Sequence, residues 1–238
     1  LGYDSCLPEI DKVISWIIPW KVYTIAAYSN TGKSKFAYNL LSHFSKQNRK
    51  ILFFSLEVDK WMVLKDLMLN YYDINHKELY SWFEYNLWDF EHLQIFDNVY
   101  DLEMIGKTIE FYKPEIVFID FTQNVTTWWR SEYEKMWTIA KKIQQFAILN
   151  KCSIFSLSQL SNSVAKEISK WDTDFVTLKW AWELFASSDV ILLLRRMTDT
   201  SNNQPMIAAK IIKNKFGAVQ NEFYYSVNFE KSQFKYRH

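Results

Sequence analysis

Short apolar runs alternate with longer amphipathic stretches along most of the chain. Apolar runs of about four to six residues predict buried strands at 22–27, 51–55, 93–96, 116–120 and 153–157. Apolar positions at helical spacing predict helices over 33–45, 102–112 and 131–149, with two or three short helices between 60 and 90. Strands and helices in alternation favour a parallel sheet.

The pattern changes toward the C-terminus. Residues 161–179 are polar without a clear period and predict a long loop, and three strand-like runs follow at 189–195, 206–213 and 222–229. Several strands close together in sequence favour antiparallel pairing. We therefore expect an α/β fold, in which a mostly parallel twisted sheet has helices on both faces and a C-terminal antiparallel extension. No internal repeat or linker interrupts the pattern, so we expect one domain over residues 1–238.

Composition excludes several classes of protein. No apolar run reaches the roughly 18 residues of a membrane span, and no signal peptide opens the sequence, so we expect no membrane contact. Cys6 and Cys152 share no metal-binding spacing and cannot form a disulfide framework, which favours a reducing, cytoplasmic location. The formal net charge is +1, so any nucleic-acid site is expected to be local.

A phosphate-binding loop is predicted between the first strand and the first long helix. Residues 27–34 read AYSNTGKS, which fits the pattern G-x-x-x-x-G-K-[ST] except that Ala27 replaces the first Gly. Lys33 is placed to reach the β- and γ-phosphates of ATP, and Ser34 to hold Mg²⁺, at the N-terminus of a helix that favours anions. The predicted phosphate cradle comprises Ser29, Asn30, Thr31, Gly32, Lys33 and Ser34.

Three polar side chains follow other predicted strands. Asp120 ends the apolar run IVFID, where an acid faces the ligand crevice of a parallel sheet and supports Mg²⁺. Glu57 follows ILFFS, and we expect it one strand away from the phosphate loop, as a candidate base for the attacking water. Gln159 follows SIFSL, where a neutral amide can contact the γ-phosphate. Each of these signals alone is also typical of a solvated residue at a strand end.

Together and in order, these strings resemble the ATPase domain of DnaB-type replicative helicases, a RecA-like P-loop NTPase. The resemblance runs from about residue 10 to residue 229. The segments that carry it are IAAYSNTGKSKFAYNL (25–40), ILFFSLEVDK (51–60), IVFIDFTQNV (116–125), SIFSLSQLSN (153–162), SSDVILLLRR (187–196) and IIKNKFG (211–217). The family also carries an N-terminal helical domain, for which this sequence has no counterpart, so we expect a fragment or a reduced relative.

The resemblance implies a role for each matching residue. Lys33, Ser34 and Asp120 would serve ATP and Mg²⁺, Glu57 would be the catalytic base, and Gln159 would sense the γ-phosphate. Lys213 and Lys215 would be basic fingers that reach the ATP of a neighbouring subunit in a hexameric ring. The family has Arg where this chain has Lys215, and Lys lacks the planar fork of Arg.

The resemblance also implies a single-stranded DNA site. In ring helicases, the loops that follow the strands of Asp120 and Gln159 face the central channel. In this chain these loops are about 124–131 and 161–179. The expected phosphate contacts are Arg130, Lys166, Lys170 and Lys179. Such contacts would be sequence-independent and sensitive to salt.

Two alternatives remain open at this stage. One is an ATPase like RadA or KaiC in DNA repair or signalling, since KNKFG also resembles a RadA segment. The other is a nucleotide-dependent DNA-binding or loader protein that does not hydrolyse ATP. The SLE and SQL strings favour the helicase, whereas Lys215 leaves the non-hydrolysing alternative open.

The tryptophan content is unusual. The chain has 4 Gly and 11 Trp in 238 residues, where average usage predicts about 17 Gly. Trp16, Trp20, Trp180 and Trp182 occupy places where the family has Gly or small residues. Some bacterial lineages read UGA as Gly, so we expect that several of these positions are glycine in the cell. The alternative is a chain with real tryptophans, whose exposed rings near 128–129 and 180–182 could stack on bases.

Overall fold

The computed structural model describes residues 2–81, 87–128, 131–160, 186–198, 204–219 and 222–237. Its strands are β1 (Val22–Tyr28), β2 (Ile51–Ser55), β3 (Leu93–Phe96), β4 (Ile116–Asp120), β5 (Ser153–Leu160), β6 (Val190–Thr198), β7 (Pro205–Asn214), β8 (Glu222–Asn228) and β9 (Gln233–Arg237). Its α-helices are α1 (Pro8–Ile14), α2 (Lys33–Lys46), α3 (Lys60–Tyr71), α4 (His76–Ser81), α5 (Leu102–Tyr112) and α6 (Glu132–Asn150). Two short 3-10 helices are η1 (Leu87–Phe90) and η2 (Thr122–Asn124).

The described strands form one nine-stranded sheet in the order β3-β2-β4-β5-β1-β6-β7-β8-β9. The pairs from β3 to β6 are parallel, and β7, β8 and β9 add antiparallel pairs. The predicted α/β fold with a C-terminal antiparallel extension is therefore confirmed. From β1 to β5, helices connect the successive parallel strands, because a parallel connection must cross over one face of the sheet.

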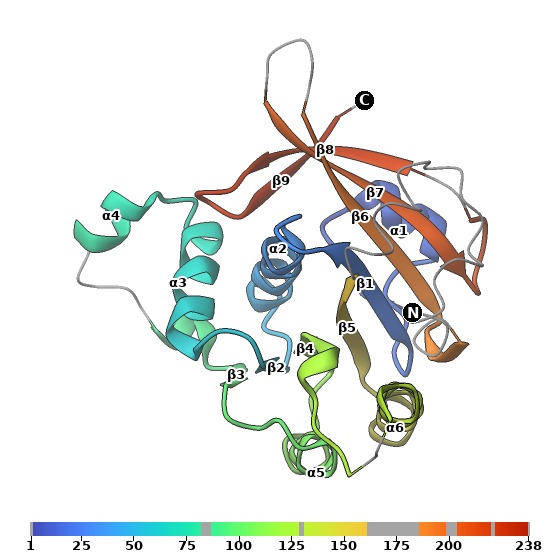
Figure 1. The fold of residues 1–238 in the computed structure, drawn as a ribbon. Helices are drawn as coiled ribbons and strands as arrows, with labels where there is room; N and C mark the ends of the chain where they lie inside the picture. Colours follow the sequence, from blue (N-terminus) through green and yellow to red (C-terminus); the bar gives the residue numbers. More distant parts are fainter. Residues whose placement is uncertain are drawn as a thin grey trace.

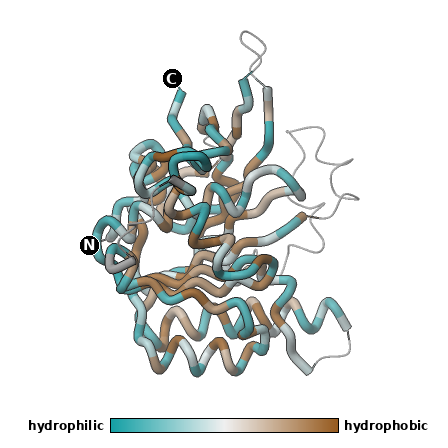
Figure 2. Tube along the Cα trace, turned by 90° about the vertical axis from the view of Figure 1, so that its left-hand side faces the viewer, coloured by the Kyte–Doolittle hydropathy of each residue, from teal (hydrophilic) through white to brown (hydrophobic). Residues whose placement is uncertain are grey.

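Helices cover both faces of the parallel strands. Figure 1 shows α2 and α3 on one side and α5 and α6 on the other. Alternate residues of each strand point to opposite faces, so Phe53 joins the cluster with α2 and α3, whereas Leu52 and Phe54 join the cluster with α5 and α6. Figure 2 accordingly shows hydrophobic segments concentrated in the central strands and hydrophilic segments on the outer helices.

Most predicted elements are confirmed to within a few residues, including the short helices between 60 and 90. Three elements were not predicted: α1, β9 and the three-residue 3-10 helix η2. α1 has only seven residues, too few for a clear helical period, and β9 has only five. β5 is longer than expected and runs to Leu160, so Gln159 lies within this strand and does not follow it. The expected loop over 161–179 lies outside the described residues.

Candidate nucleotide site

The predicted phosphate loop connects the carboxyl end of β1 to the N-terminus of α2. Gly32 begins the helix with φ 107° and ψ 21°, a left-handed conformation that suits glycine. Its carbonyl accepts the Phe36 N–H at 2.9 Å, and Tyr28 O accepts the Thr31 N–H at 3.2 Å. The first turn of α2 carries no acidic side chain. The helix N-terminus therefore offers backbone N–H groups and a positive dipole end to an anion.

Lys33 and Asp120 form a buried pair beside this loop. Lys33 Nζ lies 3.4 Å from Asp120 Oδ1, and the side chains are 7% and 3% exposed. Among the described residues, neither of these two atoms has a hydrogen-bond partner, because the pair is close but poorly aligned for a hydrogen bond. Lys33 Nζ also lies 4.6 Å from the centre of the Phe121 ring. Buried charges without hydrogen bonds are costly, so this arrangement suits a site that a phosphate and a cation complete.

Ser34 and Asp120 fit the requirements of Mg²⁺. Magnesium is usually held by one or two protein oxygens together with the phosphates of the substrate. Asp120 Oδ1 is buried without a hydrogen bond, and Ser34 is half-buried in the first turn of α2. Within the described part of the chain, no group of three or more His, Cys, Asp or Glu residues could hold a metal by itself. The donor set therefore suits a cation that arrives with a nucleotide.

Glu57 lies at the same edge of the sheet, but not where the sequence placed it. We expected it one strand from the phosphate loop, and this expectation is wrong, because β4 and β5 separate β2 from β1. The strand next to β2 is β4: Ser55 pairs with Asp120, and the N–H of Leu56, one residue before Glu57, donates to Asp120 O at 2.7 Å. Glu57 is exposed on the turn that follows. Strand order depends on long-range pairing, which local sequence patterns do not encode.

A shared electrostatic environment also links these acids. The Tyr38 hydroxyl of α2 is buried, and its pKa is raised well above the usual value. Burial is the largest cause, followed by the nearby carboxylates of Asp120, Asp66 and Glu57. Asp120 and Glu57 therefore act on the same buried group beside α2.

Gln159 lies beside the start of the phosphate loop in the sheet. β5 is the direct neighbour of β1, and Gln159 is paired with Ala27, the first residue of the loop motif. Its backbone is also bonded to the side chain of Gln123 in η2. Gln123 lies in the string IVFIDFTQNV, but no local pattern in the sequence predicts a role for it.

Lys213 and Lys215 lie at the opposite end of β1. Lys215 Nζ lies 2.8 Å from Asp189 Oδ1, and Asp189 Oδ2 accepts the N–H of Val22, the first residue of β1, at 2.9 Å. Lys213 Nζ donates to Ala186 O at 3.4 Å. At about 3.3 Å per residue, the length of β1 separates this end from the phosphate loop by roughly 20 Å. The two lysines are therefore remote from the phosphate loop of their own chain.

Two further residues, Arg196 and Phe229, flank the phosphate loop. The sequence did not predict that either of them lies there. The Arg196 guanidinium stacks 4.8 Å from the centre of the Phe229 ring, and its Nη1 donates to Asn30 O at 3.5 Å. Phe229 Cε1 would lie 3.0 Å from a Cβ added to Gly32. Phe229 also lines a surface hollow of about 610 Å³ next to β8. Only the fold brings these residues to the loop, since nearly 200 positions separate Phe229 from it.

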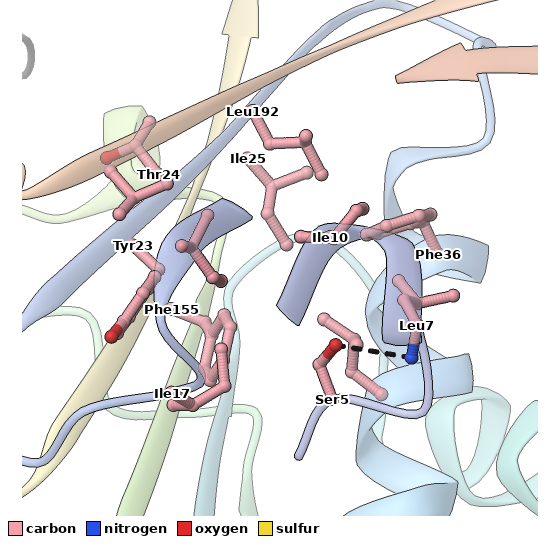
Figure 3. Close-up of a pocket in the computed structure, with 13 residues that line it drawn as sticks. Ser5, Leu7, Ile10, Ile17, Tyr23, Thr24, Ile25, Phe36, Phe155 and Leu192 are labelled. Atoms are coloured by element: carbon pink, nitrogen blue, oxygen red, sulfur yellow. Dashed lines mark hydrogen bonds between the residues drawn. The ribbon is translucent and has the colours of Figure 1, made fainter. Parts of the chain in front are cut away.

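A second, smaller space lies inside the core between α1 and β1. Figure 3 shows Ile10, Ile25 and Leu192 around it, with Phe36 nearby. Its volume is about 30 Å³. This cavity belongs to the core packing and is too small for a nucleotide.

The residues expected to contact DNA cannot be placed. Arg130, Lys166, Lys170 and Lys179 all lie outside the described residues. In the parts of the chain that the structure describes, none of the helices has the length and apolar character that crossing a membrane requires.

The nine-stranded sheet, the phosphate loop after β1 and the acid at the end of β4 define a P-loop protein of the RecA-like class. The comparison with family models is more specific. The model of the DnaB-like helicase C-terminal domain matches residues 2–238, so the chain belongs to this family. No match was found among curated proteins.

Solved structures show the same fold. One of them is the structure of an ATPase domain alone. It has a TM-score of 0.84 and 21% identity, over 98% of this chain and 90% of that one. A DnaB-like replicative helicase, reported with its interactions with primase, also has a TM-score of 0.84 and 21% identity. This chain, 98% of which is aligned, spans 61% of that helicase. The flagellar accessory protein FlaH from Methanocaldococcus jannaschii has a TM-score of 0.65 and 16% identity, over 97% and 95% of the two chains.

The backbone conformation at two tryptophans helps to decide whether these positions are glycine in the cell. Trp16 and Trp20 have φ values of 72° and 69°, in a region that bulky residues rarely adopt. Trp16 follows the end of α1, where helices commonly place a glycine. Both side chains are about half exposed, at 53% and 51%. These two positions thus have the conformation that glycine favours, as expected if they are glycine in the cell.

Proposed function

We propose that this chain is an ATP-hydrolysing motor domain that assembles into a hexameric ring and moves along single-stranded DNA. The observation that carries the proposal is the buried pair of Lys33 and Asp120 beside a helix N-terminus. Lys33 and the loop amides would bind the β- and γ-phosphates, and Ser34 and Asp120 would hold the Mg²⁺ that accompanies the nucleotide. The metal would neutralise charge that develops on the phosphates.

The residues around this pair support the hydrolytic step. Glu57 is exposed beside Asp120 and would orient the attacking water and take its proton. Gln159 would contact the γ-phosphate from the neighbouring strand β5. Arg196 and Phe229 would offer a flat cationic and aromatic surface to the base of the nucleotide.

The position of Lys213 and Lys215 supports a ring. They lie at the end of the sheet remote from the phosphate loop of their own chain, so they would act on a nucleotide bound to a neighbour. Head-to-tail contacts between identical subunits close into rings and bring opposite ends of neighbouring subunits together. Two positive charges there would stabilise the charge of the transition state.

Steady-state ATPase rates with and without single-stranded DNA test the proposal. We expect DNA-stimulated turnover that Lys33→Ala abolishes. Lys35→Ala is the matched control, because Lys35 lies on the same helix and pairs with Asp66 at the surface. An unchanged rate in Lys33→Ala would contradict the proposal, as would a monomeric native mass with bound nucleotide.

A nucleotide-dependent DNA-binding protein is the second candidate. The observation that favours it is the pairing of Lys215 with Asp189, which engages the finger residue within its own chain. ATP binding without turnover, with or without DNA, would support this candidate against the motor.

A further inference from the structure

The end of β4 leaves the last residues of β5 without a strand partner on one side, since their other side pairs with β1. The ladder between the two strands stops at Asp120 and Leu157, where the chain turns into η2, whereas β5 continues to Leu160. The side chain of Gln123 takes over this place. Its Nε2 donates to Gln159 O at 2.9 Å, and its Oε1 accepts the Gln159 N–H at 3.3 Å. The amide of Gln123 therefore bonds Gln159 as the next residue of a strand would.

The second N–H of this amide also has a partner. Gln123 Nε2 donates to Ser158 Oγ at 2.8 Å, so its two N–H groups and its oxygen all have partners. Gln159 lies between this amide on one side and Ala27 of β1 on the other. Its backbone is therefore fixed from both sides, which restricts where its own half-buried side chain can reach.

The backbone of Gln123 leads away from the nucleotide site. Its carbonyl accepts from Lys135 Nζ of α6 at 3.2 Å. Thr122 Oγ1 is 2.6 Å from Ser156 Oγ and 3.0 Å from Leu157 O, which anchors the same segment on β5. A shift of the tip of β5 would therefore reach η2 and the start of α6, on either side of residues 125–131.

We propose that Gln123 is a positioning residue that aligns Gln159 with the γ-phosphate and transmits the state of the nucleotide to the segment before α6. The inference rests on the proposed function, because it needs ATP in the phosphate loop. Gln123 does not touch the nucleotide, and it acts through the backbone of Gln159. The coupling follows a continuous set of hydrogen bonds from Gln159 through Gln123 to Lys135 of α6.

The test compares Gln123→Met with the unchanged chain. Met keeps the length of the side chain and removes all three hydrogen bonds of the amide. We measure the affinities for ADP and for a non-hydrolysable ATP analogue with Mg²⁺, and the ATPase rate with and without single-stranded DNA. Loss of hydrogen bonds to Gln159 is expected to lower the preference for the ATP analogue over ADP by about 5-fold or more. The affinity for ADP is expected to stay unchanged, and the stimulation by DNA to fall.

Three further variants make the test specific. Gln123→Glu keeps one acceptor but places a negative charge against Gln159 O, so its effect should equal or exceed that of Met. Ser158→Ala removes one partner only and should give a smaller effect in the same direction, even if Gln123→Met does not fold. Gln145→Met, at an exposed position of α6, is the matched control and should leave every value unchanged.

The outcomes separate the two proposals. A normal nucleotide preference and normal DNA stimulation in Gln123→Met and Gln123→Glu would overturn the role of Gln123. Additive effects of Gln123→Met and Gln159→Ala would also overturn it, since residues that act through one another are expected to be non-additive. If the unchanged chain binds no nucleotide, the proposed function itself fails.

Discussion

The ammonium of Lys215 lies 2.8 Å from the carboxylate of Asp189, at the end of β1 remote from the phosphate loop. Asp189 is 6% exposed and also accepts the N–H of Val22, so its position is fixed by the first residue of β1. An ammonium has three donors, and Asp189 engages one of them. Lys215 is thus held in place by Asp189, and the proposed contact with the phosphate of a neighbouring subunit would use the donors that Asp189 does not engage.

Rings assembled from a mixture of Lys33→Ala and Lys215→Ala subunits should therefore recover ATPase activity that neither variant has alone. Lys33→Ala removes the lysine proposed to bind phosphate, and Lys215→Ala removes the proposed finger. If the proposed ring forms, each variant alone is expected to lose most ATPase activity. In mixed rings, an intact Lys33 can meet an intact Lys215 of the neighbour. Mixing the two variants should restore part of the ATPase rate. No recovery at any ratio, despite exchange of subunits, would contradict action between subunits.

The ATPase rate should fall as the pH rises through about 8. Burial, with the nearby charge of Lys215, lowers the pKa of Lys213 from 10.5 to about 8, although Asp189 opposes this shift. A lysine is charged below its pKa, so Lys213 carries its positive charge at neutral pH and loses it above pH 8. The measurement is kcat from pH 6 to 10, at saturating ATP.

Two substitutions identify the group that titrates. Lys213→Arg keeps the charge throughout this range and should remove the alkaline decline. Asp189→Asn removes the carboxylate that raises the pKa of Lys213 and should move the decline to lower pH. A profile that is the same in all three proteins would assign the decline to another group.

Gly32→Ala should weaken both folding and nucleotide binding. The φ of 107° strains any residue with a Cβ, and the new methyl would lie 3.0 Å from Phe229 Cε1. We expect a loss of about 1–2 kcal/mol in the free energy of unfolding, together with weaker binding of ATP. Thermal or urea unfolding and a nucleotide titration measure the two effects.

Gly32→Ala combined with Phe229→Ala separates the two causes. Truncation of Phe229 relieves the contact but leaves the φ strain. Relative to Phe229→Ala alone, the added glycine substitution should then cost less than it does in the unchanged chain. A stability equal to that of the unchanged chain in the single Gly32→Ala variant would contradict the strain argument.

Trp16→Gly and Trp20→Gly should each stabilise the chain by about 1 kcal/mol, because both positions have positive φ. Urea unfolding measures the gain. Trp137→Gly is the control: this residue lies within α6, where glycine costs about 1 kcal/mol relative to a good helix former. Destabilisation by the first two substitutions would argue that the indole side chains of Trp16 and Trp20 themselves stabilise the fold. The codons settle the chemical identity, since UGG at these positions would exclude glycine.

Most of the secondary structure and part of the candidate nucleotide site follow from the sequence alone. Apolar periods give the bounds of most strands and helices, because a buried strand or a helix face needs apolar residues at fixed spacing. The string SNTGKS places the phosphate loop, since a Gly, a Lys and a hydroxyl at this spacing suit a triphosphate with Mg²⁺. Asp120 could be singled out because it ends a strongly apolar strand.

The tertiary structure decided how these pieces meet. It placed β4 and β5 between Glu57 and the phosphate loop, so that β2, which precedes Glu57, pairs with the strand that ends at Asp120. It also brought Phe229 against Gly32, and the amide of Gln123 to the backbone of Gln159. Local patterns record which residues are buried and where the chain turns. Strand order and side-chain bridges depend on pairing between distant segments, and only the folded chain contains that information.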